Sequence, residues 1–419
     1  MHSLLWLMQA PHWSITAAWG FFIASYVVFA FGRLPGTRLD RPAAAVIGAV
    51  AMVACRVLTA QQAIASVDFA TIVLLFSMML IVAGLHLSGF FHDVVHLIAD
   101  RVEGRWLLPG IVFSSGILSA FLVNDVVCLF MAPMVLSLAR KLQRPASPLL
   151  LALATAANIG SAATITGNPQ NILIGSLSGI GYLRFLARLG PPALIGLFVD
   201  WGLIYWLTRN EHATYMPPPR EPEQDFVATH LPEHRRWAVG VALIVVVGFL
   251  FGVDPPFVAA IGGALILLAP SIERERLFGE VDWSLLVLFT GLFIIIGGAE
   301  QSGIAQKLLS VAERGNLHQP AIFTVAVTAL SNVVSNVPAV MLVKGIIPSM
   351  GNPQYSWMLL AMTSTLAGNL TITGSVANII VVEKARQESP IGFFQYMRIG
   401  LPVTVCTMLV GIAWLWLTR

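Results

Sequence analysis

The chain has 419 residues, of which 57% are hydrophobic and only 11% are charged, and its formal net charge is +3. A soluble protein of this length would carry about a quarter charged residues, so the composition excludes an ordinary soluble protein and indicates a polytopic membrane protein. Its three cysteines, Cys55, Cys128 and Cys406, lie far apart and match no metal or disulfide spacing.

The apolar segments predict a series of membrane-spanning helices, each of which needs about 20 apolar residues. In chain order the predicted crossings are 13–32, 43–60, 69–89, 148–178, 191–208, 237–253, 255–273, 283–299, 357–385 and 399–418. Two further apolar blocks, 106–140 and 319–350, carry polar residues at their middle. Each is either two crossings or one re-entrant hairpin that ends near the membrane midplane.

The basic residues favour hairpins. If both blocks enter and leave on one side, most arginines and lysines of the loops collect on that side, as the positive-inside rule requires of the cytoplasm. Both termini then lie outside, in the periplasm of a cell with an inner membrane. The Pro-rich segment 209–236, which contains "MPPPREPEQ", is predicted to be a cytoplasmic linker.

Two repeats divide the chain into related halves. "VDFATIVLLFSMMLIVAGLHLSG" at 67–89 matches "VDWSLLVLFTGLFIIIGGAEQSG" at 281–303, and "TITGNPQN" at Thr164–Asn171 matches "TITGSVAN" at Thr371–Asn378. We therefore predict an all-α membrane protein of two repeats, each with five transmembrane helices and one hairpin. Because five is odd, the second repeat is inverted, a design known in secondary transporters. Chance similarity of apolar stretches is the alternative.

The two predicted repeats contain the same elements in the same order. The first repeat, 1–208, consists of scaffold helices (13–89), an arm helix (90–105), a hairpin (106–140), a broken helix (148–178) and a final helix (191–208). The second repeat, 237–419, consists of scaffold helices (237–299), an arm helix (300–316), a hairpin (319–350), a broken helix (357–385) and a final helix (399–418).

The repeated TITG phrase predicts a binding site. A helix broken inside a membrane exposes backbone groups that cost several kcal/mol each when they are unpaired. A half-helix N-terminus suits an anion or an oxyanion, whereas unwound carbonyls and Thr or Asn oxygens suit Na⁺ or a hydroxylic solute. The candidate residues are Thr166, Gly167, Asn168, Asn171, Thr373, Gly374, Ser375 and Asn378. The alternative is a pair of packing kinks between helices.

The hairpin tips are predicted to face the helix breaks. Asn124 and Asp125 lie at one tip, and Ser335 and Asn336 lie at the other. Asp125 is the only acid at either tip, and an acid within a membrane is a functional candidate by default. We expect Asp125 to carry the coupling proton. His86, Asp200 and Glu300 are weaker candidates for that role.

Four motifs carry a family resemblance: "FLVNDVVCLFMAP", "ANIGSAATITGNPQN", "SNVVSNVPAVMLV" and "LAGNLTITGSVANIIVVEKA". They resemble the ion transporter superfamily, and in particular its arsenite-permease and Na⁺/H⁺-antiporter group. The divalent anion:Na⁺ symporters are more distantly similar. The resemblance implies a scaffold domain and a transport domain that moves as an elevator. It also implies arsenite, antimonite, silicate, Na⁺, sulfate, citrate or dicarboxylates as substrates.

The hairpin tips depart from the Na⁺/dicarboxylate branch, which typically has Ser-Asn-Thr at both. Here Asn124-Asp125 and Ser335-Asn336-Val337 take those places. An acid at the tip would repel a dianion, but it tolerates a neutral polyhydroxylated solute such as As(OH)₃, or a cation. The first tip resembles the arsenite permeases.

The sequence therefore predicts a secondary transporter that exports arsenite and antimonite in exchange for protons, and so confers arsenic resistance. A Na⁺/H⁺ antiporter and an ion-coupled transporter of inorganic or carboxylate anions are the alternatives. We predict no enzyme, because no nucleophile–base pair or metal-spaced cluster occurs, and no cofactor, because no nucleotide-binding motif occurs. The coupling ion is a proton or Na⁺. A homodimer and, by family resemblance, a soluble ATPase are possible partners, and nucleic acid is not.

Overall fold

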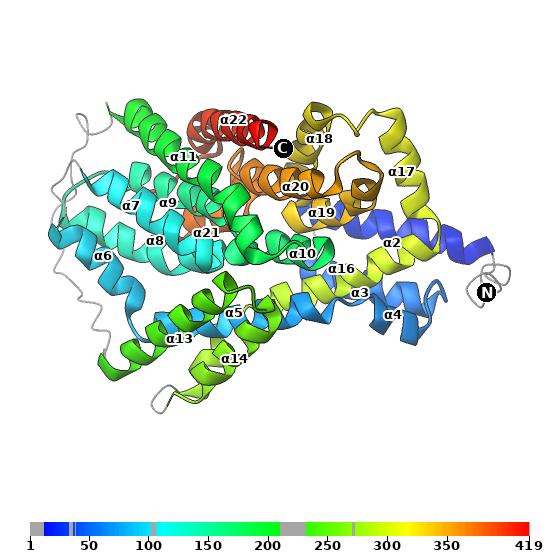
Figure 1. The fold of residues 1–419 in the computed structure, drawn as a ribbon, viewed down its shortest axis with the longest axis horizontal. Helices are drawn as coiled ribbons and strands as arrows, with labels where there is room; N and C mark the ends of the chain where they lie inside the picture. The colour runs from blue at the N-terminus through cyan, green and yellow to red at the C-terminus, as the bar shows by residue number, and fades with distance from the viewer. Residues whose placement is uncertain are drawn as a thin grey trace. The chain divides into compact units, whose positions relative to one another are not determined.

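The structure is a computed structural model that describes residues 12–32, 37, 39–101, 106–209, 232–269 and 273–418 (Figure 1). Within these ranges the regular elements are helices and no strand occurs, so the predicted all-α class is confirmed. Most of the predicted linker at 209–236 lies outside the described residues. The chain divides into two compact units, and each is described by itself.

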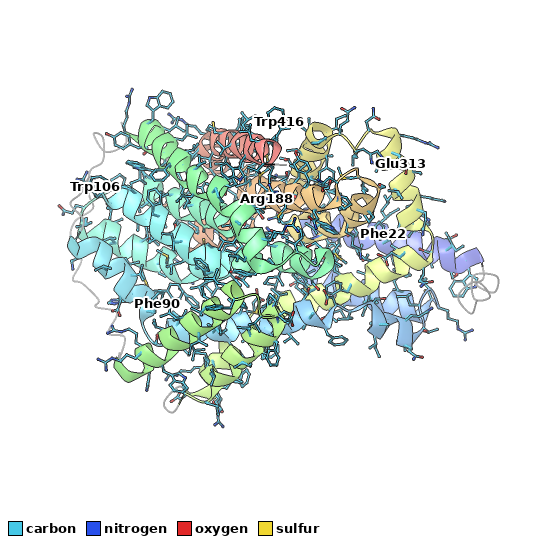
Figure 2. The ribbon with its side chains drawn as sticks, viewed as in Figure 1. Phe22, Phe90, Trp106, Arg188, Glu313 and Trp416 are labelled. Carbon is cyan, nitrogen blue, oxygen red and sulfur yellow. The ribbon has the colours of Figure 1, made fainter. Side chains whose placement is uncertain are left out.

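Long apolar helices account for the membrane character. Among the described residues, five helices are long and apolar enough to cross a membrane: α2 (His12–Phe31), α5 (Phe69–Leu87), α11 (Tyr182–Thr208), α16 (Trp283–Gln301) and α22 (Phe393–Leu417). Large apolar side chains on such helices remain exposed, as do Trp106 and Trp416, which Figure 2 labels. An exposed apolar surface of this extent suits lipid rather than water.

The first unit contains the described parts of Met1–Ile72 and Asp282–Ser356. Its elements are α2, α3 (Arg41–Ala54), α4 (Ala60–Ser66), α16, α17 (Ile304–Arg314), α18 (Pro320–Val334), α19 (Asn336–Val343) and the 3₁₀ helix η3 (Lys344–Ser349). Asp40 begins α3 by accepting a 3.0 Å hydrogen bond from the Ala43 N–H, and Thr59 and Gln62 form a capping box that begins α4.

The second unit contains the described parts of Val73–Val281 and Trp357–Arg419. Its elements include α6 (Phe90–Arg101), α7 (Leu107–Phe121), α8 (Asn124–Lys141), α9 (Ala146–Ser161), α10 (Pro169–Ser178), α13 (Pro232–Leu250), α14 (Pro255–Leu267), α15 (Arg274–Gly279), most of α20 (Pro353–Ala367) and α21 (Val376–Ala385). Most of α5, all of α11 and α22, and two 3₁₀ turns, η2 (Ile165–Gly167) and η4 (Ile372–Gly374), also belong to it.

A close approach of glycines fixes the packing of this unit's central helices. Helices α7, α8 and α9 lie side by side, and α11 runs beside α9 and α22 (Figure 1). A Cβ atom on Gly160 of α9 would lie only 1.9 Å from the carbonyl oxygen of Gly116 on α7. Only a residue without a side chain allows the two backbones to meet there.

Both apolar blocks with polar centres consist of two helices joined by a short break. In the first block α7 ends at Phe121 and α8 begins at Asn124. In the second, α18 ends at Val334 and α19 begins at Asn336, and Ser335 between them has φ +77° and ψ 160°. That backbone region is essentially confined to glycine, so Ser335 is strained. The short helices α4 and α15 are additions to the predicted elements.

Candidate functional site

The two TITG phrases have the same backbone. Thr164 has φ −134° and ψ 164°, and Thr371 has φ −135° and ψ 163°. Each is followed by a single 3₁₀ turn, then by an extended residue, Asn168 or Ser375, and then by a ten-residue helix, α10 or α21. Pro169 suits the first position of α10, because a helix leaves that N–H without an internal partner. The predicted helix breaks are thus present in both copies.

An asparagine side chain holds the first break in place. Asn171 donates from its amide nitrogen to the carbonyl oxygens of Ser161, at 3.1 Å, and Thr164, at 3.0 Å. The Asn168 side chain caps α10 by accepting from the Asn171 N–H at 2.8 Å. The broken backbone therefore obtains from side chains the partners that a continuous helix would supply.

The second break is held by the equivalent asparagine. Asn378 donates to the carbonyl oxygens of Gly368 and Thr371, at 2.6 Å and 3.0 Å. The three residues of this second set follow their counterparts in the first break by 207 residues: Asn378 follows Asn171, Gly368 follows Ser161, and Thr371 follows Thr164. The two phrases are similar in hydrogen bonding as well as in letters.

Asn158 on α9 is the centre of a buried cluster of neutral polar side chains. Its Oδ1 accepts from Asn124 Nδ2 at 2.8 Å and from Ser375 Oγ at 2.9 Å. Its Nδ2 donates to the Oδ1 atoms of Asn369, at 2.8 Å, and Asn378, at 2.9 Å. Asn158 thus makes all four hydrogen bonds that a primary amide can make. We call Asn124, Asn158, Asn369, Ser375 and Asn378, with Asn168, Asn171 and Thr365, the amide cluster.

The two halves contribute to this cluster reciprocally. Asn168 donates to Thr365 Oγ1 at 3.1 Å, and Ser375 donates to Asn158 Oδ1 at 2.9 Å. Thr365 is 207 residues after Asn158, and Ser375 is 207 residues after Asn168. Each pair therefore joins the break of one half to the helix before the break of the other. Such an exchange of partners is what a two-fold relation between the segments would produce.

The amide cluster is buried and carries no formal charge. Asn158, Asn168, Asn171, Asn369 and Asn378 are all 0–1% exposed, and none of the cluster's hydrogen bonds given above includes an acid, a lysine or an arginine. The N-termini of α8, α10 and α21 contribute Asn124, Asn168 and Ser375 to it. The dipoles of these helices add partial positive charge at their N-termini.

The remaining TITG residues support the breaks. Thr166 lies 3.0 Å from the Tyr182 hydroxyl oxygen, and Thr373 lies 3.3 Å from the Thr371 hydroxyl oxygen. A Cβ atom on Gly167 would lie 2.2 Å from the Ser161 carbonyl oxygen, so the turn requires glycine. Gly374 ends η4, the matching turn.

The other predicted residues have distinct surroundings. Asp125, beside Asn124 at the first tip, is partly exposed and has an interaction partner. Ser335 and Asn336 belong to the first unit, and the amide cluster belongs to the second. Glu300 forms a 2.9 Å ion pair with Lys344, which gives it a structural partner in its own unit.

His86 and Asp200 both lie in the second unit. His86 stacks on Phe130, and its Nδ1 lies 3.5 Å from Glu280 Oε1. Burial raises the pKa of the Glu280 carboxyl above its usual range, and the charge of Lys384 partly offsets this effect. Asp200 is 0% exposed and lies 3.1 Å from Thr155 Oγ1.

Asn158, Thr365 and Asn369, which hold the amide cluster together, are not among the site residues predicted from the sequence. A signal for the first two was available, because 158 and 365 have the same 207-residue offset as the TITG phrases. Asn369 has Ala162 as its counterpart, so the repeat gives no signal for it.

The similarity of this chain to known proteins shows its family. The citrate transporter family model matches residues 26–367, which is most of the chain. The chain belongs to the citrate transporter family. This family is part of the ion transporter superfamily, so the predicted membership of that superfamily is confirmed. The chain is a secondary transporter rather than an enzyme, as predicted. The chain is a multi-pass membrane protein.

Relatives in this family differ in what their names describe. The rice silicon efflux transporter LSI3 (Oryza sativa subsp. japonica) is 29% identical and aligns over 95% of this chain and 96% of its own. A 46 kDa membrane protein of Mycobacterium leprae is 30% identical and aligns over 94% of this chain and 97% of its own. A Dictyostelium discoideum transporter named arsB is 22% identical and aligns over 89% of this chain and 87% of its own.

A solved structure has the same fold. The Alcanivorax borkumensis YdaH transporter superposes with a TM-score of 0.54 over 97% of this chain and 98% of its own. At 16% identity this likeness bears on the fold alone.

Proposed function

We propose that this citrate-transporter-family protein exports small, uncharged, polyhydroxylated solutes, namely arsenite and antimonite as As(OH)₃ and Sb(OH)₃, in exchange for protons. The neutral amide cluster carries the proposal. Amide and hydroxyl groups donate to and accept from the hydroxyls of such a solute. A trivalent anion would instead need cationic partners to compensate its lost hydration, and the cluster's hydrogen bonds include no cation.

Two relatives support this substrate class. One is named a silicon efflux transporter, and another is named arsB. In this proposal Asn124 and Asn158 bind the solute where the two helix breaks meet, after the solute has displaced some of the amide–amide hydrogen bonds. Asp125, which follows Asn124 at the tip, carries the exchanged proton.

Carboxylate transport is the second candidate. The family description names citrate, and three helix N-termini contribute residues to the amide cluster. Their partial charges would favour an oxyanion, with Na⁺ as the coupling ion bound by carbonyl oxygens. A Na⁺/H⁺ antiporter would use the same oxygens for the cation alone.

The proposed transport mechanism, membrane and partners are those that the sequence predicts. Two inverted repeats would let the hairpins and broken helices move as an elevator, so that the cluster faces each side of the cell inner membrane in turn. A homodimer would supply a fixed scaffold. A soluble ATPase would dock, if it binds, on the cytoplasmic loops.

Transport in proteoliposomes tests the substrate and the coupling ion together. Vesicles with an imposed pH gradient should accumulate arsenite and antimonite against their gradients, whereas citrate and sulfate should equilibrate slowly or not at all. An imposed Na⁺ gradient without a pH gradient should drive no accumulation. Accumulation of citrate driven by Na⁺, with no arsenite movement, would overturn the proposal in favour of the second candidate.

Asp125→Asn tests the proton carrier. This variant keeps the shape of the side chain but cannot titrate, so it should abolish uphill arsenite accumulation and leave downhill exchange partly active. Uphill accumulation at the wild-type rate would show that Asp125 does not carry the proton.

A further inference from the structure

Asp200 in the middle of α11 has an unusual environment for an acid. Within the part of the chain that the structure describes, it is the only acidic or basic residue that is fully buried, at 0% exposed. No ion pair of the described residues includes it, and its Oδ1 atom has no hydrogen-bond partner there. A carboxylate in that setting would have neither solvent nor a cation to compensate its charge. In this conformation Asp200 is therefore the neutral acid.

The hydroxyl of Thr155 on α9 shows where that proton lies. Thr155 Oγ1 is 2.9 Å from the Leu151 carbonyl oxygen and 3.1 Å from Asp200 Oδ2. A hydroxyl has one proton, and the Leu151 carbonyl can only accept, so the hydroxyl proton serves that shorter contact. The contact with Oδ2 is then a hydrogen bond that protonated Asp200 donates. If Asp200 loses its proton to water, the Thr155 hydroxyl can turn and donate to the carboxylate, which releases the Leu151 carbonyl.

Thr155 is also joined to the amide cluster. Its carbonyl oxygen accepts from Asn369 Nδ2 at 3.1 Å, and Asn369 Oδ1 accepts from Asn158 Nδ2 at 2.8 Å. Thr155 and Asn158 lie one turn apart on α9, and Asn369 lies just before the second helix break. A movement of Thr155 therefore reaches both the centre of the cluster and one of its breaks.

The surroundings of Asp200 contain few other groups that could titrate with it. Helices α7 and α9 and the turn η2, which pack against α11, have no acidic or basic residue. From α22, the buried Tyr396 lies near Asp200. The remaining ionisable groups of α22 and α13 whose side chains are described are exposed or partly exposed: Arg398, Cys406, His234, Arg235 and Arg236.

We propose that Asp200 and Thr155 form a second proton-binding site, separate from Asp125, whose protonation sets the geometry of the amide cluster. With Asp200 protonated, Thr155 holds Asn369 and Asn158 in the closed arrangement described here. With Asp200 ionised, the turned Thr155 hydroxyl and the resulting shift of α9 loosen the Asn369–Asn158 contact. Solute affinity then depends on the Asp200 proton. This last statement rests on the proposed function, because it takes the amide cluster as the solute site.

Infrared spectroscopy tests the proton-binding site without any solute. Difference spectra of the purified wild-type protein between about pH 5 and about pH 9, a range that covers raised carboxyl pKa values, should contain the carbonyl-stretch band of a buried carboxylic acid. The band should disappear in Asp200→Asn and persist in Asp125→Asn. Thr155→Val should shift its frequency, because the hydrogen bond is lost, and Thr155→Ser should restore it. A band unchanged by Asp200→Asn, or no such band in wild type, overturns the proposal.

The coupling to the cluster is tested by the pH profile of arsenite binding, measured by titration calorimetry over the same pH range. Wild-type affinity should change with pH, by at most about tenfold per unit for one linked proton. In Asp200→Asn, whose amide donates to Thr155 at every pH, the affinity should keep only the pH dependence that Asp125 contributes, and in the double variant Asp125→Asn with Asp200→Asn it should be independent of pH. Thr155→Val should also flatten the profile, and Thr155→Ser should keep it.

The two proposals can fail separately. If arsenite does not bind at any pH, the proposed function fails, and the infrared result still decides whether Asp200 holds a titrating proton. If arsenite binds with the same pH dependence in wild type and Asp200→Asn, the proposed function stands and the link between Asp200 and the cluster is overturned.

Discussion

At the scale of single residues, Asn158 supports more of the candidate site than any residue that the sequence predicts for it. All four of its hydrogen bonds go to side chains from other elements of the second unit. In a buried setting each of these partners would be left with an unpaired group if the amide were removed. Each such group costs about 1–3 kcal/mol, although neighbouring amides can re-pair and reduce the total.

We therefore expect Asn158→Ala to lower the free energy of unfolding by about 2–4 kcal/mol and to weaken arsenite binding by about tenfold or more. Thermal unfolding in detergent and titration calorimetry measure the two effects. Gln61→Ala, which removes an exposed amide, is the matched control and should change neither quantity. Wild-type stability in Asn158→Ala would mean that the cluster is not a connected network.

Ser335 permits a test of strain at the second hairpin tip. Its φ of +77° with ψ of 160° is a conformation that glycine adopts far more easily than serine. Ser335→Gly should be more stable than Ser335→Ala by about 1–3 kcal/mol, because both lack the hydroxyl but only alanine keeps the strain. Chemical or thermal unfolding of the two variants measures the difference. Equal stability would indicate that the tip relaxes to another backbone conformation.

At the scale of elements, the contact between α7 and α9 decides where the first hairpin lies. Gly160→Ala would place its methyl group 1.9 Å from the Gly116 carbonyl oxygen, so the two helices must separate. We expect destabilisation of about 3 kcal/mol or more, since such overpacking displaces backbone rather than a flexible side chain. Because α7 continues into the tip at Asn124, solute binding should weaken as well.

Gly240→Ala is the control for helix propensity. Gly240 lies within α13, and no atom lies within 4 Å of the position that its Cβ atom would take. Alanine there should leave stability unchanged or raise it by up to about 1 kcal/mol, because glycine is the poorer helix former. If both substitutions have the same effect in thermal unfolding, the close approach of α7 and α9 is not what makes Gly160 necessary.

At the scale of the whole molecule, the distribution of arginine and lysine predicts the orientation in the membrane. In a variant without Cys55, Cys128 and Cys406, a cysteine introduced by Glu223→Cys should react with an impermeant maleimide only after the membrane is permeabilised. Gly181→Cys, in the exposed turn between α10 and α11, should react in intact cells. The opposite pattern would invert the predicted topology.

The sequence by itself determined the class of the protein and much of its local structure. Hydropathy gave the helices, since a membrane accepts long apolar segments only as helices or closed barrels. The Gly, Pro and Asn of the TITG phrases predicted both helix breaks. These residues interrupt and cap helices through their own backbone conformation and through hydrogen bonds to residues close in sequence. The same repeat extends to the hydrogen bonds of Asn171 and Asn378, which reach carbonyls seven and ten residues away.

Only the tertiary structure decided which polar side chains meet. The partners of Asn158 include Asn369 and Asn378, which lie 211 and 220 residues away, and no local pattern records that approach. The same holds for Asp200 and Thr155, 45 residues apart on α11 and α9. The sequence shows which polar residues lie in apolar helices, where an unpaired polar group costs free energy. The packing of the helices determines whether an amide, a hydroxyl or nothing compensates it.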